Sequence, residues 1–298
     1  MLRFLRRPSL AVAVVSNEPY AVGTAVTVRS LLEALDPAWR VRLTVLDGGL
    51  SEESRRKLTA SWEGFPVTTR FLAPRREDVA HLKLTGGMTE LTYYRLLLPG
   101  LLPRERKILY LDSDLLVRGD LAPLWETDLA GRPTAAVRDI LISTTLSHIP
   151  RHETVGLDPD APYFSAAVLL MDLDAWRGRK IGQRTIAFIA AHPECIRWWD
   201  QDGLNAVSNG DWTEVDPRWN VYAESARLLG WEAPSERKEE IERLVAEQRI
   251  LHFATRYKPW KHACPHPKTA DFLAVLDRTA WRGWRPAPET EEPYPPRA

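Results

Sequence analysis

The sequence predicts an α/β protein with a mostly parallel central sheet, and three observations lead to this prediction. Short apolar runs of strand length alternate along the chain with segments of helical spacing, as in strand–helix–strand units. Several of these runs are apolar throughout, which is typical of strands that are covered on both faces. The chain has 298 residues, 44% of them hydrophobic, which is enough to bury a substantial core.

The first part of the chain shows this alternation most clearly. The run from Leu10 to Val15 is continuously apolar and predicts a buried strand. Apolar residues recur at roughly helical spacing from Val22 to Leu35, which predicts an amphipathic helix. Further strands are predicted at 41–46 and 67–72, and a helix that begins after Ser51 separates them.

The later elements follow a similar but less regular order. A break at Gly86 and Gly87 precedes a predicted helix at 89–98. The remaining predicted strands cover 107–111, 135–137, 164–173 and 250–253, and a charged helix covers 235–248 with Ile241, Leu244 and Val245 inward. The stretch 138–162 has little periodicity and is long for a connection, so we expect a functional loop there.

The composition excludes several classes of protein. Forty basic residues balance 40 acidic ones, so the usual electrostatic argument for nucleic-acid binding is absent and we expect no nucleic-acid partner. Two cysteines, Cys195 and Cys264, cannot form a disulfide framework, and a cytoplasmic location is the simplest expectation. The basic start and the apolar run after it resemble a signal peptide, but we interpret that run as the first strand.

We expect one domain, residues 1–278, because no convincing linker precedes about residue 279. Residues 279–298 are predicted to form a C-terminal tail. Trp and Arg alternate at 281–285, which suits a membrane interface, and 286–298 is rich in Pro and Glu and is predicted to be disordered. Peripheral contact of this tail with the inner face of a membrane is therefore an expectation.

Two carboxylates, Asp112 and Asp114, follow the buried strand at 107–111. Ligands of open α/β sheets bind at the carboxyl ends of strands, and residues i and i+2 of an extended chain point the same way. The pair could therefore face one Mg²⁺ or Mn²⁺, which prefer oxygen ligands. A strand-end turn with solvated carboxylates explains the spacing equally well.

The same spacing occurs in three other places, so it is a weak indication by itself. Asp158-Pro-Asp160 predicts a turn, and in the copy that starts at Asp172, Asp174 is predicted to cap a helix. The third copy is Asp200-Gln-Asp202. Only the copy at Asp112 both follows a long apolar strand and is itself followed by the apolar run Leu115-Leu-Val117.

Several motifs occur in a fixed order around these carboxylates. Tyr93-Tyr-Arg-Leu96 precedes the strand and its Asp-Ser-Asp, and the later motifs are 163–173, Asp200-Gln-Asp-Gly-Leu-Asn205, Asp216-Pro-Arg-Trp-Asn220, and His252-Phe253 before Lys258-Pro-Trp260. In this combination, from about Leu10 to Pro267, the chain resembles glycosyltransferase family 8. The resemblance implies a GT-A fold, a single Rossmann-like domain, and a retaining transferase that uses a nucleotide-diphosphate sugar.

The resemblance also implies a role for each matching position. Asp112, Asp114 and His252 match metal ligands, which implies Mn²⁺ or Mg²⁺ as the cofactor. Lys258 matches a lysine that contacts the donor's phosphates, and the implied donor-binding residues also include Asn17, Ser165 and Asp200. Without the resemblance, His252 would be interpreted as a structural histidine, Lys258 as a surface lysine and Asn17 as a turn residue.

The remaining implied roles concern the sugar. Arg95 and Asp139 match positions that hold the sugar hydroxyls, and Gln201 and Asp202 belong to the segment beneath its anomeric carbon. An amide is a poor nucleophile, so we expect Gln201 to stabilise oxocarbenium character.

The chain departs from the family pattern at three positions. Ser165 stands where the family usually has Asn, Ala167 where it has Gly, and Thr255 where it often has Gly. These departures put the identity of the donor sugar in doubt.

The predicted function is metal-dependent transfer of a hexose from UDP-glucose or UDP-galactose to a hydroxyl of a glycan or glycolipid. Two alternatives stay open. A non-catalytic sugar-nucleotide-binding protein of the same fold would bind UDP and metal without turnover. A nucleotidyltransferase would release pyrophosphate, but the first strand is not followed by a Gly-rich, basic loop.

Overall fold

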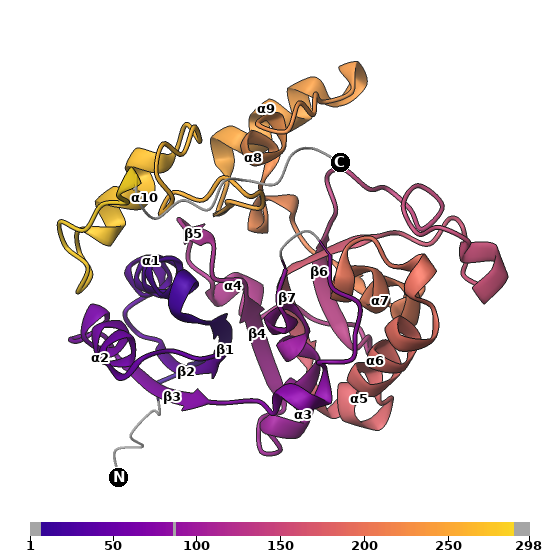
Figure 1. Ribbon diagram of the computed structural model, residues 1–298, viewed down its shortest axis with the longest axis horizontal. Helices are drawn as coiled ribbons and strands as arrows, with labels where there is room; N and C mark the ends of the chain where they lie inside the picture. The colour runs from indigo at the N-terminus through magenta and orange to yellow at the C-terminus, as the bar shows by residue number, and fades with distance from the viewer. Residues whose placement is uncertain (1–6, 86–87, 289–298) are drawn as a thin grey trace, which may run out of the picture.

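The computed structural model describes residues 7–85 and 88–288, and Figure 1 shows its arrangement. Among these residues seven strands form one sheet in the order β3-β2-β1-β4-β7-β6-β8. The strands are β1 (Ser9–Ser16), β2 (Arg40–Asp47), β3 (Val67–Leu72), β4 (Lys107–Leu111), β6 (Thr134–Arg138), β7 (Phe164–Asp172) and β8 (Thr213–Glu214). Strands β1 to β4 pair in parallel, whereas β7 is antiparallel to β4 and β6, and β8 is parallel to β6. The predicted α/β class with a mostly parallel sheet is confirmed.

Helices cover both faces of this sheet (Figure 1). They are α1 (Ala21–Ala34), α2 (Glu52–Ser61), α3 (Leu98–Leu101), α4 (Ala122–Trp125), α5 (Leu173–Gly178), α6 (Ile181–Ala191), α7 (Trp199–Ser208), α8 (Ala223–Arg227), α9 (Lys238–Glu247) and α10 (Thr269–Leu276). Strand β1 shows why its run is apolar throughout. Its residues Leu10, Val12 and Val14 pack in the core cluster with α1 and α10. Its alternate residues pack in the cluster with α5, α6 and α7 on the other face.

A second, two-stranded sheet pairs β5 (Leu115–Val117) with β9 (Ile250–His252) in antiparallel register. It joins the chain just after β4 to a segment far along the sequence. Thr27 of α1 anchors this sheet, because its hydroxyl donates to the Leu115 carbonyl at 2.9 Å and accepts from the Leu115 N–H at 3.0 Å. The second sheet therefore holds distant parts of the chain beside the carboxyl end of β4.

Most of the elements predicted from periodicity are confirmed. The predicted strands 67–72 and 107–111 coincide with β3 and β4, and the predicted first helix is α1 with its ends shifted by one residue. The Ser51 hydroxyl caps α2 as predicted, accepting from the Ser54 N–H at 3.1 Å. In α9, Ile241 and Leu244 are buried as predicted, and Val245 is half-buried.

Two local predictions differ from the structure, the first in the type of helix. The segment predicted as a helix at 89–98 is a 3₁₀ helix, Glu90–Leu97, followed by the short α3. Pro99 has no N–H to donate to the Arg95 carbonyl, so the Leu98 N–H does so and the turn tightens. The break predicted at Gly86 and Gly87 lies outside the described residues.

The second prediction, a helix cap at Asp174, is wrong. Strand β7 runs directly into α5, so Asp172 is the N-cap and its side chain accepts from the Ala175 N–H at 2.9 Å. Asp174 lies in the first turn of the helix and pairs with Arg106 at 3.0 Å and Arg177 at 2.6 Å. Pattern analysis placed the helix start two residues too late because Asp is a good cap at either position.

The described part of the predicted tail packs on the protein. Trp281 is 7% exposed and joins the core cluster of α1 and α10. Arg285 pairs with Asp277 at 2.6 Å. The buried Trp281 ring is not accessible to a membrane, while residues 289–298 of the predicted tail lie outside the described residues. The boundary at 278 stays a prediction, and none of the described helices is long and apolar enough to cross a membrane.

A candidate metal and donor site at the strand ends

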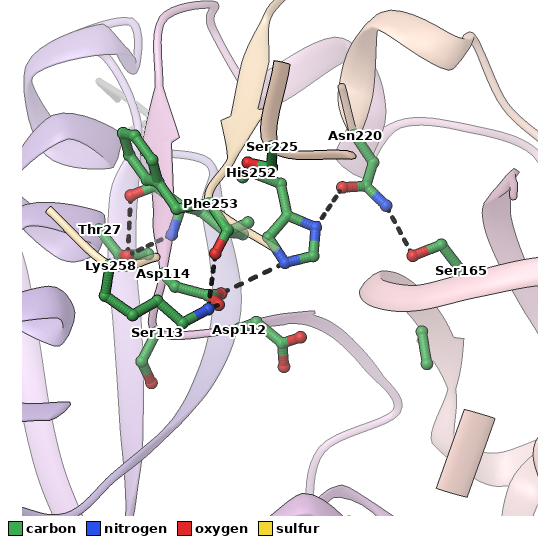
Figure 2. Close-up of polar contacts among 12 residues, drawn as sticks. Thr27, Asp112, Ser113, Asp114, Ser165, Asn220, Ser225, His252, Phe253 and Lys258 are labelled. Atoms are coloured by element: carbon green, nitrogen blue, oxygen red, sulfur yellow. Dashed lines mark hydrogen bonds and ion pairs between the residues drawn. The ribbon is translucent and has the colours of Figure 1, made fainter. Parts of the chain in front are cut away.

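The predicted metal ligands come together at the carboxyl end of β4. Asp112 and Asp114 follow this strand, and pairing of β5 with β9 sets Leu115 opposite His252. Each of the three side chains offers one ligand atom, and these atoms lie within 4.8 Å of one another (Figure 2). The Phe253 N–H donates to the Asp114 carbonyl at 3.0 Å, which continues the strand pairing past His252. The fold therefore assembles the Asp-Asp-His cluster through backbone hydrogen bonds.

Asp114 is the more buried of the two carboxylates in this cluster, with 8% of the residue exposed. One carboxylate oxygen, Oδ2, accepts from the ammonium of Lys258, which also donates to the Phe253 carbonyl at 2.6 Å. Burial alone would raise the pKa of Asp114, but the Lys258 ammonium opposes it and that pKa lies below its usual value. Burial alone would lower the pKa of Lys258, but Asp114 reverses the shift. Both groups are therefore charged.

The other oxygen, Asp114 Oδ1, has no hydrogen-bond donor among the described residues although it is buried. It lies 3.4 Å from His252 Nε2, without the alignment of a hydrogen bond. A buried carboxylate oxygen without a donor is costly unless something positive contacts it. Two carboxylates and an imidazole suit a divalent cation such as Mn²⁺, so these residues fit the implied metal.

Asp112 connects the cluster to the interior. Its Oδ1 accepts from the Tyr110 hydroxyl at 2.8 Å and lies 3.0 Å from Arg95 Nη2. Burial raises the pKa of Asp112, Asp114 adds to the rise, and Arg95 opposes it. The side chain is 25% exposed, so Asp112 is the more open of the two carboxylates.

Arg95 lies at the junction of two groups of polar side chains. It is 5% exposed, its guanidinium lies 4.4 Å from the centre of the Tyr110 ring, and its Nε lies 2.9 Å from Asp200 Oδ2. The Arg95 guanidinium and the Asp200 carboxylate form an ion pair but not a hydrogen bond, and no donor among the described residues is aligned with Asp200 Oδ2. Thr92 donates to the other Asp200 oxygen at 2.6 Å. Burial raises the pKa of Asp200 to about 6 against the opposing effects of Arg95 and Thr92.

The side chains of Asp139 and Gln201 are joined by a hydrogen bond. Gln201 Nε2 donates to Asp139 Oδ2 at 3.1 Å, and Gln201 Oε1 accepts from the Ala166 N–H of β7 at 2.9 Å. Asp139 Oδ1 accepts from the Tyr222 hydroxyl at 2.6 Å and from the Leu141 N–H at 2.9 Å. Burial raises the pKa of Asp139, and these hydrogen bonds oppose it. The Gln201 amide is thus fixed in place on both sides.

Asp202 has the contacts of a structural residue. It is fully buried, at 0% exposed, and its Oδ2 accepts from the N–H groups of Arg197 and Trp198 at 2.6 Å each. Its Oδ1 accepts from the Tyr163 hydroxyl. These hydrogen bonds fix the chain that enters α7. Its implied place beneath the sugar stays a prediction, and the structure supports a structural role.

The last two predicted donor-binding residues have partners within the protein. Asn17 follows β1 and its side chain accepts from the Tyr20 N–H at 3.2 Å, so it is at least a turn residue. Ser165 of β7 is 4% exposed and accepts from Asn220 Nδ2 at 2.8 Å. Asn220 Oδ1 in turn lies 3.0 Å from His252 Nδ1. Sequence analysis gave Asn220 no role, because only its place in the Asp-Pro-Arg-Trp-Asn motif marked it.

Comparison with known proteins decides the family. Residues 11–264 match the model of a protein family that is described as "Glycosyl transferase family 8". The chain belongs to glycosyltransferase family 8. Among solved structures, the galactosyltransferase LgtC, in complex with donor and acceptor sugar analogs, superposes with a TM-score of 0.77 at 26% identity, over 91% of this chain and 96% of LgtC. The predicted GT-A fold is thereby confirmed.

Curated relatives agree with this family assignment. General stress protein A of Bacillus subtilis is 29% identical over 258 residues, 85% of this family 8 chain and 87% of that protein. The lipopolysaccharide 1,2-glucosyltransferase of Escherichia coli is 24% identical over 180 residues, 59% of this chain and 50% of that protein. The family match over residues 11–264 identifies the chain as a glycosyltransferase.

Proposed function

We propose that this glycosyltransferase is a metal-dependent, retaining hexosyltransferase that moves glucose or galactose from its UDP-sugar to a hydroxyl of a glycan or glycolipid. The observation that supports it most is the Asp112, Asp114 and His252 cluster, with Lys258 beside it. A galactosyltransferase and a lipopolysaccharide glucosyltransferase among the similar proteins support a hexose donor and a glycan or glycolipid acceptor.

The strand-end residues are suited to hold a nucleoside diphosphate. Asp112, Asp114 and His252 would bind a divalent cation, Mn²⁺ or Mg²⁺, which when bound neutralises charge on the diphosphate. The Lys258 ammonium is fixed beside Asp114 and supplies a further positive charge for the leaving group. Asn17, at the end of β1, is assigned to the nucleotide, and Asp200 holds Arg95 in place.

The residues between β4 and α7 are suited to position the sugar. Arg95 and Asp139 offer a rigid fork of donors and a carboxylate acceptor for sugar hydroxyls. The Gln201 amide is held by Asp139 and Ala166, so its dipole is oriented in advance of the reaction. A fixed dipole can stabilise positive charge at the anomeric carbon, whereas an amide is a poor nucleophile. The acceptor hydroxyl then attacks from the face that the leaving group vacates, and the leaving phosphate takes its proton.

We propose further that the reaction takes place in the cytoplasm, at or near the inner face of the membrane when the acceptor is lipid-linked. The buried Trp281 ring gives no support to membrane contact through the start of the C-terminal segment. Contact through the rest of that segment stays a proposal.

The decisive experiment measures UDP release from a panel of UDP-hexoses with Mn²⁺, with Mg²⁺ and with EDTA. Asp114→Asn is compared with Asp174→Asn, a matched control because Asp174 is half-exposed on α5. We expect one donor to be turned over with metal, and both EDTA and Asp114→Asn to abolish turnover. Metal-dependent UDP binding with no turnover on any acceptor would favour the non-catalytic binder, and pyrophosphate release would favour a nucleotidyltransferase. Failure to bind either UDP or metal would overturn the proposal.

A further inference from the structure

The His252 ring is held on the side away from the carboxylates by a chain of hydrogen bonds (Figure 2). Its Nδ1 lies 3.0 Å from Asn220 Oδ1, and Asn220 Nδ2 donates to Ser165 Oγ at 2.8 Å. The three residues come from β9, from the end of the 3₁₀ turn Pro217–Trp219, and from β7. They are between 3% and 7% exposed, so water does not compete freely for these bonds.

This arrangement determines which ring nitrogen carries the proton. An amide oxygen can only accept, so the neutral His252 ring must carry its proton on Nδ1 to pair with Asn220 Oδ1. Nε2 then presents a lone pair toward Asp114 Oδ1, 3.4 Å away. The absence of hydrogen-bond alignment there agrees with two acceptors facing each other. Two acceptors this close are favourable only when they share a cation.

We propose that Asn220, braced by Ser165, is a positioning residue: it selects the Nδ1–H tautomer of His252 and aims the Nε2 lone pair at the metal position. The inference rests on the metal-dependent function proposed above. This positioning role explains why the buried amide of Asn220 lies between β7 and β9. Through Asn220 and His252, Ser165 also contributes to metal binding.

The His252 main chain offers a matched control. The Ser225 hydroxyl donates to the His252 carbonyl at 2.9 Å and is fully buried. Ser225→Ala therefore removes a hydrogen bond to the same residue without touching the ring. Asn220→Leu removes the acceptor at similar size, and Asn220→Asp keeps an acceptor for Nδ1–H that can also accept from the Ser165 hydroxyl.

The first measurement is the tautomer of His252, read from ¹⁵N NMR of EDTA-treated protein at a pH where the ring is neutral, with His252→Gln to assign the signal. We expect Nδ1–H in the wild type and in Asn220→Asp. In Asn220→Leu we expect a shift toward Nε2–H, which can then donate to Asp114. A wild-type ring with its proton on Nε2 would overturn the proposal.

The second measurement is Mn²⁺ affinity in the presence of UDP, by electron paramagnetic resonance of free Mn²⁺, on variants whose thermal unfolding shows that they are folded. Loss of a residue that orients a metal ligand weakens binding by roughly 10- to 100-fold, which we expect for Asn220→Leu, with a smaller loss for Ser165→Ala. Asn220→Asp and Ser225→Ala should bind about as tightly as the wild type. Equal affinity of Asn220→Leu and the wild type would overturn the positioning role.

The two measurements separate this inference from the proposed function. A wild type that binds no Mn²⁺ or Mg²⁺ would overturn the metal centre and with it the aim of the His252 lone pair. A wild type that binds metal, combined with an unaffected Asn220→Leu, would leave the proposed function standing and remove only the role of Asn220.

Discussion

Two neighbouring groups of buried polar residues differ in how far the protein satisfies them. In the strand-end cluster of Asp112, Asp114, His252 and Lys258, charges face one another and one buried oxygen, Asp114 Oδ1, has no donor among the described residues. In the α7 network of Asp139, Asp200, Gln201 and Asp202, each carboxylate is contacted by groups of the protein itself. The first group is incomplete without a ligand. In the second, the one carboxylate oxygen without an aligned donor among the described residues, Asp200 Oδ2, is paired with Arg95 at 2.9 Å.

Because of this difference, we expect the two groups of residues to have different functions. A buried carboxylate oxygen that has no donor in the protein is available to a cation. Groups that are hydrogen-bonded or ion-paired within the protein hold their geometry, which is what orientation of a sugar requires. Substitutions in the strand-end cluster should therefore reduce activity more than stability, and substitutions in the α7 network should reduce stability at least as much.

The largest effect is expected for Lys258→Met. Loss of a fixed positive charge at the leaving group should lower kcat/KM for the donor by on the order of 10²- to 10³-fold. Steady-state UDP release, with thermal unfolding measured alongside, tests this. Lys238→Met, at an exposed position on α9, is the control and should leave kcat/KM unchanged. A kcat/KM for Lys258→Met within a few-fold of the wild type would show that the diphosphate does not depend on this ammonium.

The two groups also differ in how well the sequence predicts them. Local pattern indicates only Asp112 and Asp114, which come directly after a continuous apolar strand, and it fits a solvated turn equally well. His252 was predicted as a ligand from the family resemblance. The antiparallel pairing of β5 with β9 then brings them together. The contacts of Asn220 with His252 and Ser165 join three separate segments, so no local pattern could reveal them.

Local composition was misleading where tertiary packing decides the outcome. Trp281, in a segment interpreted as a tail, is buried against α1 and α10. Asp202 shares the Asp-x-Asp spacing of Asp112 and Asp114, yet its oxygens accept from the backbone that enters α7. The same carboxylate spacing therefore occurs after a strand at Asp112 and in the first turn of a helix at Asp202, and the surrounding donors distinguish the two.

The next effect concerns stability of the α7 network. Asp202→Asn keeps the shape of the side chain but replaces a carboxylate by an amide. Either the amide N–H₂ or the amide oxygen, a weaker acceptor than a carboxylate, then faces the backbone N–H groups of Arg197 and Trp198. Leaving buried donors unpaired costs about 1–3 kcal/mol, so the free energy of unfolding should fall by that amount in urea denaturation. The folded variant should lose less kcat/KM than Lys258→Met does. A stable but inactive Asp202→Asn would instead restore Asp202 to the group of residues that act on the sugar.

A smaller effect, with opposite signs for activity and stability, is expected from the pKa of Asp200. Below pH about 6 this carboxylate takes up a proton and Arg95 loses one of its two charged partners, so kcat/KM should fall as the pH decreases through that region. Because the folded-state pKa of about 6 lies above the ordinary 3.8, the contribution of Asp200 to stability is full below 3.8 and is lost as the pH rises through 6. The pH profile of UDP release tests the first part, the predicted fall in kcat/KM. The Asp200→Asn variant should be less active than the wild type at neutral pH, and its activity should not show the decrease near pH 6. The ¹³C titration of the Asp200 carboxyl tests the second part, and a midpoint near the ordinary 3.8 would contradict both.

The smallest effect separates the two buried histidines that lie near Ser225. His252 faces two carboxylates, whereas His266 accepts from the Lys268 N–H at 3.1 Å and lies 3.1 Å from Ser225 Oγ. Burial, with Lys268 and Lys258 nearby, lowers the pKa of His266 to about 4.

A lowered histidine pKa contributes stability that is full above the ordinary value of 6.5 and is lost as the pH falls through 4. Unfolding free energies measured from pH 7 to 4 should therefore decline less steeply in His266→Gln than in the wild type, by roughly 1–2 kcal/mol across the range. Among the described residues, the His266 ring makes its hydrogen bonds with Lys268 and Ser225 and packs on Phe253, none of which is a proposed metal ligand. Mn²⁺ affinity at neutral pH should therefore not change. A loss of Mn²⁺ affinity in His266→Gln would mean that the Ser225 contact transmits to the metal position, and that the ring hydrogen bonds of His252 are not its only support.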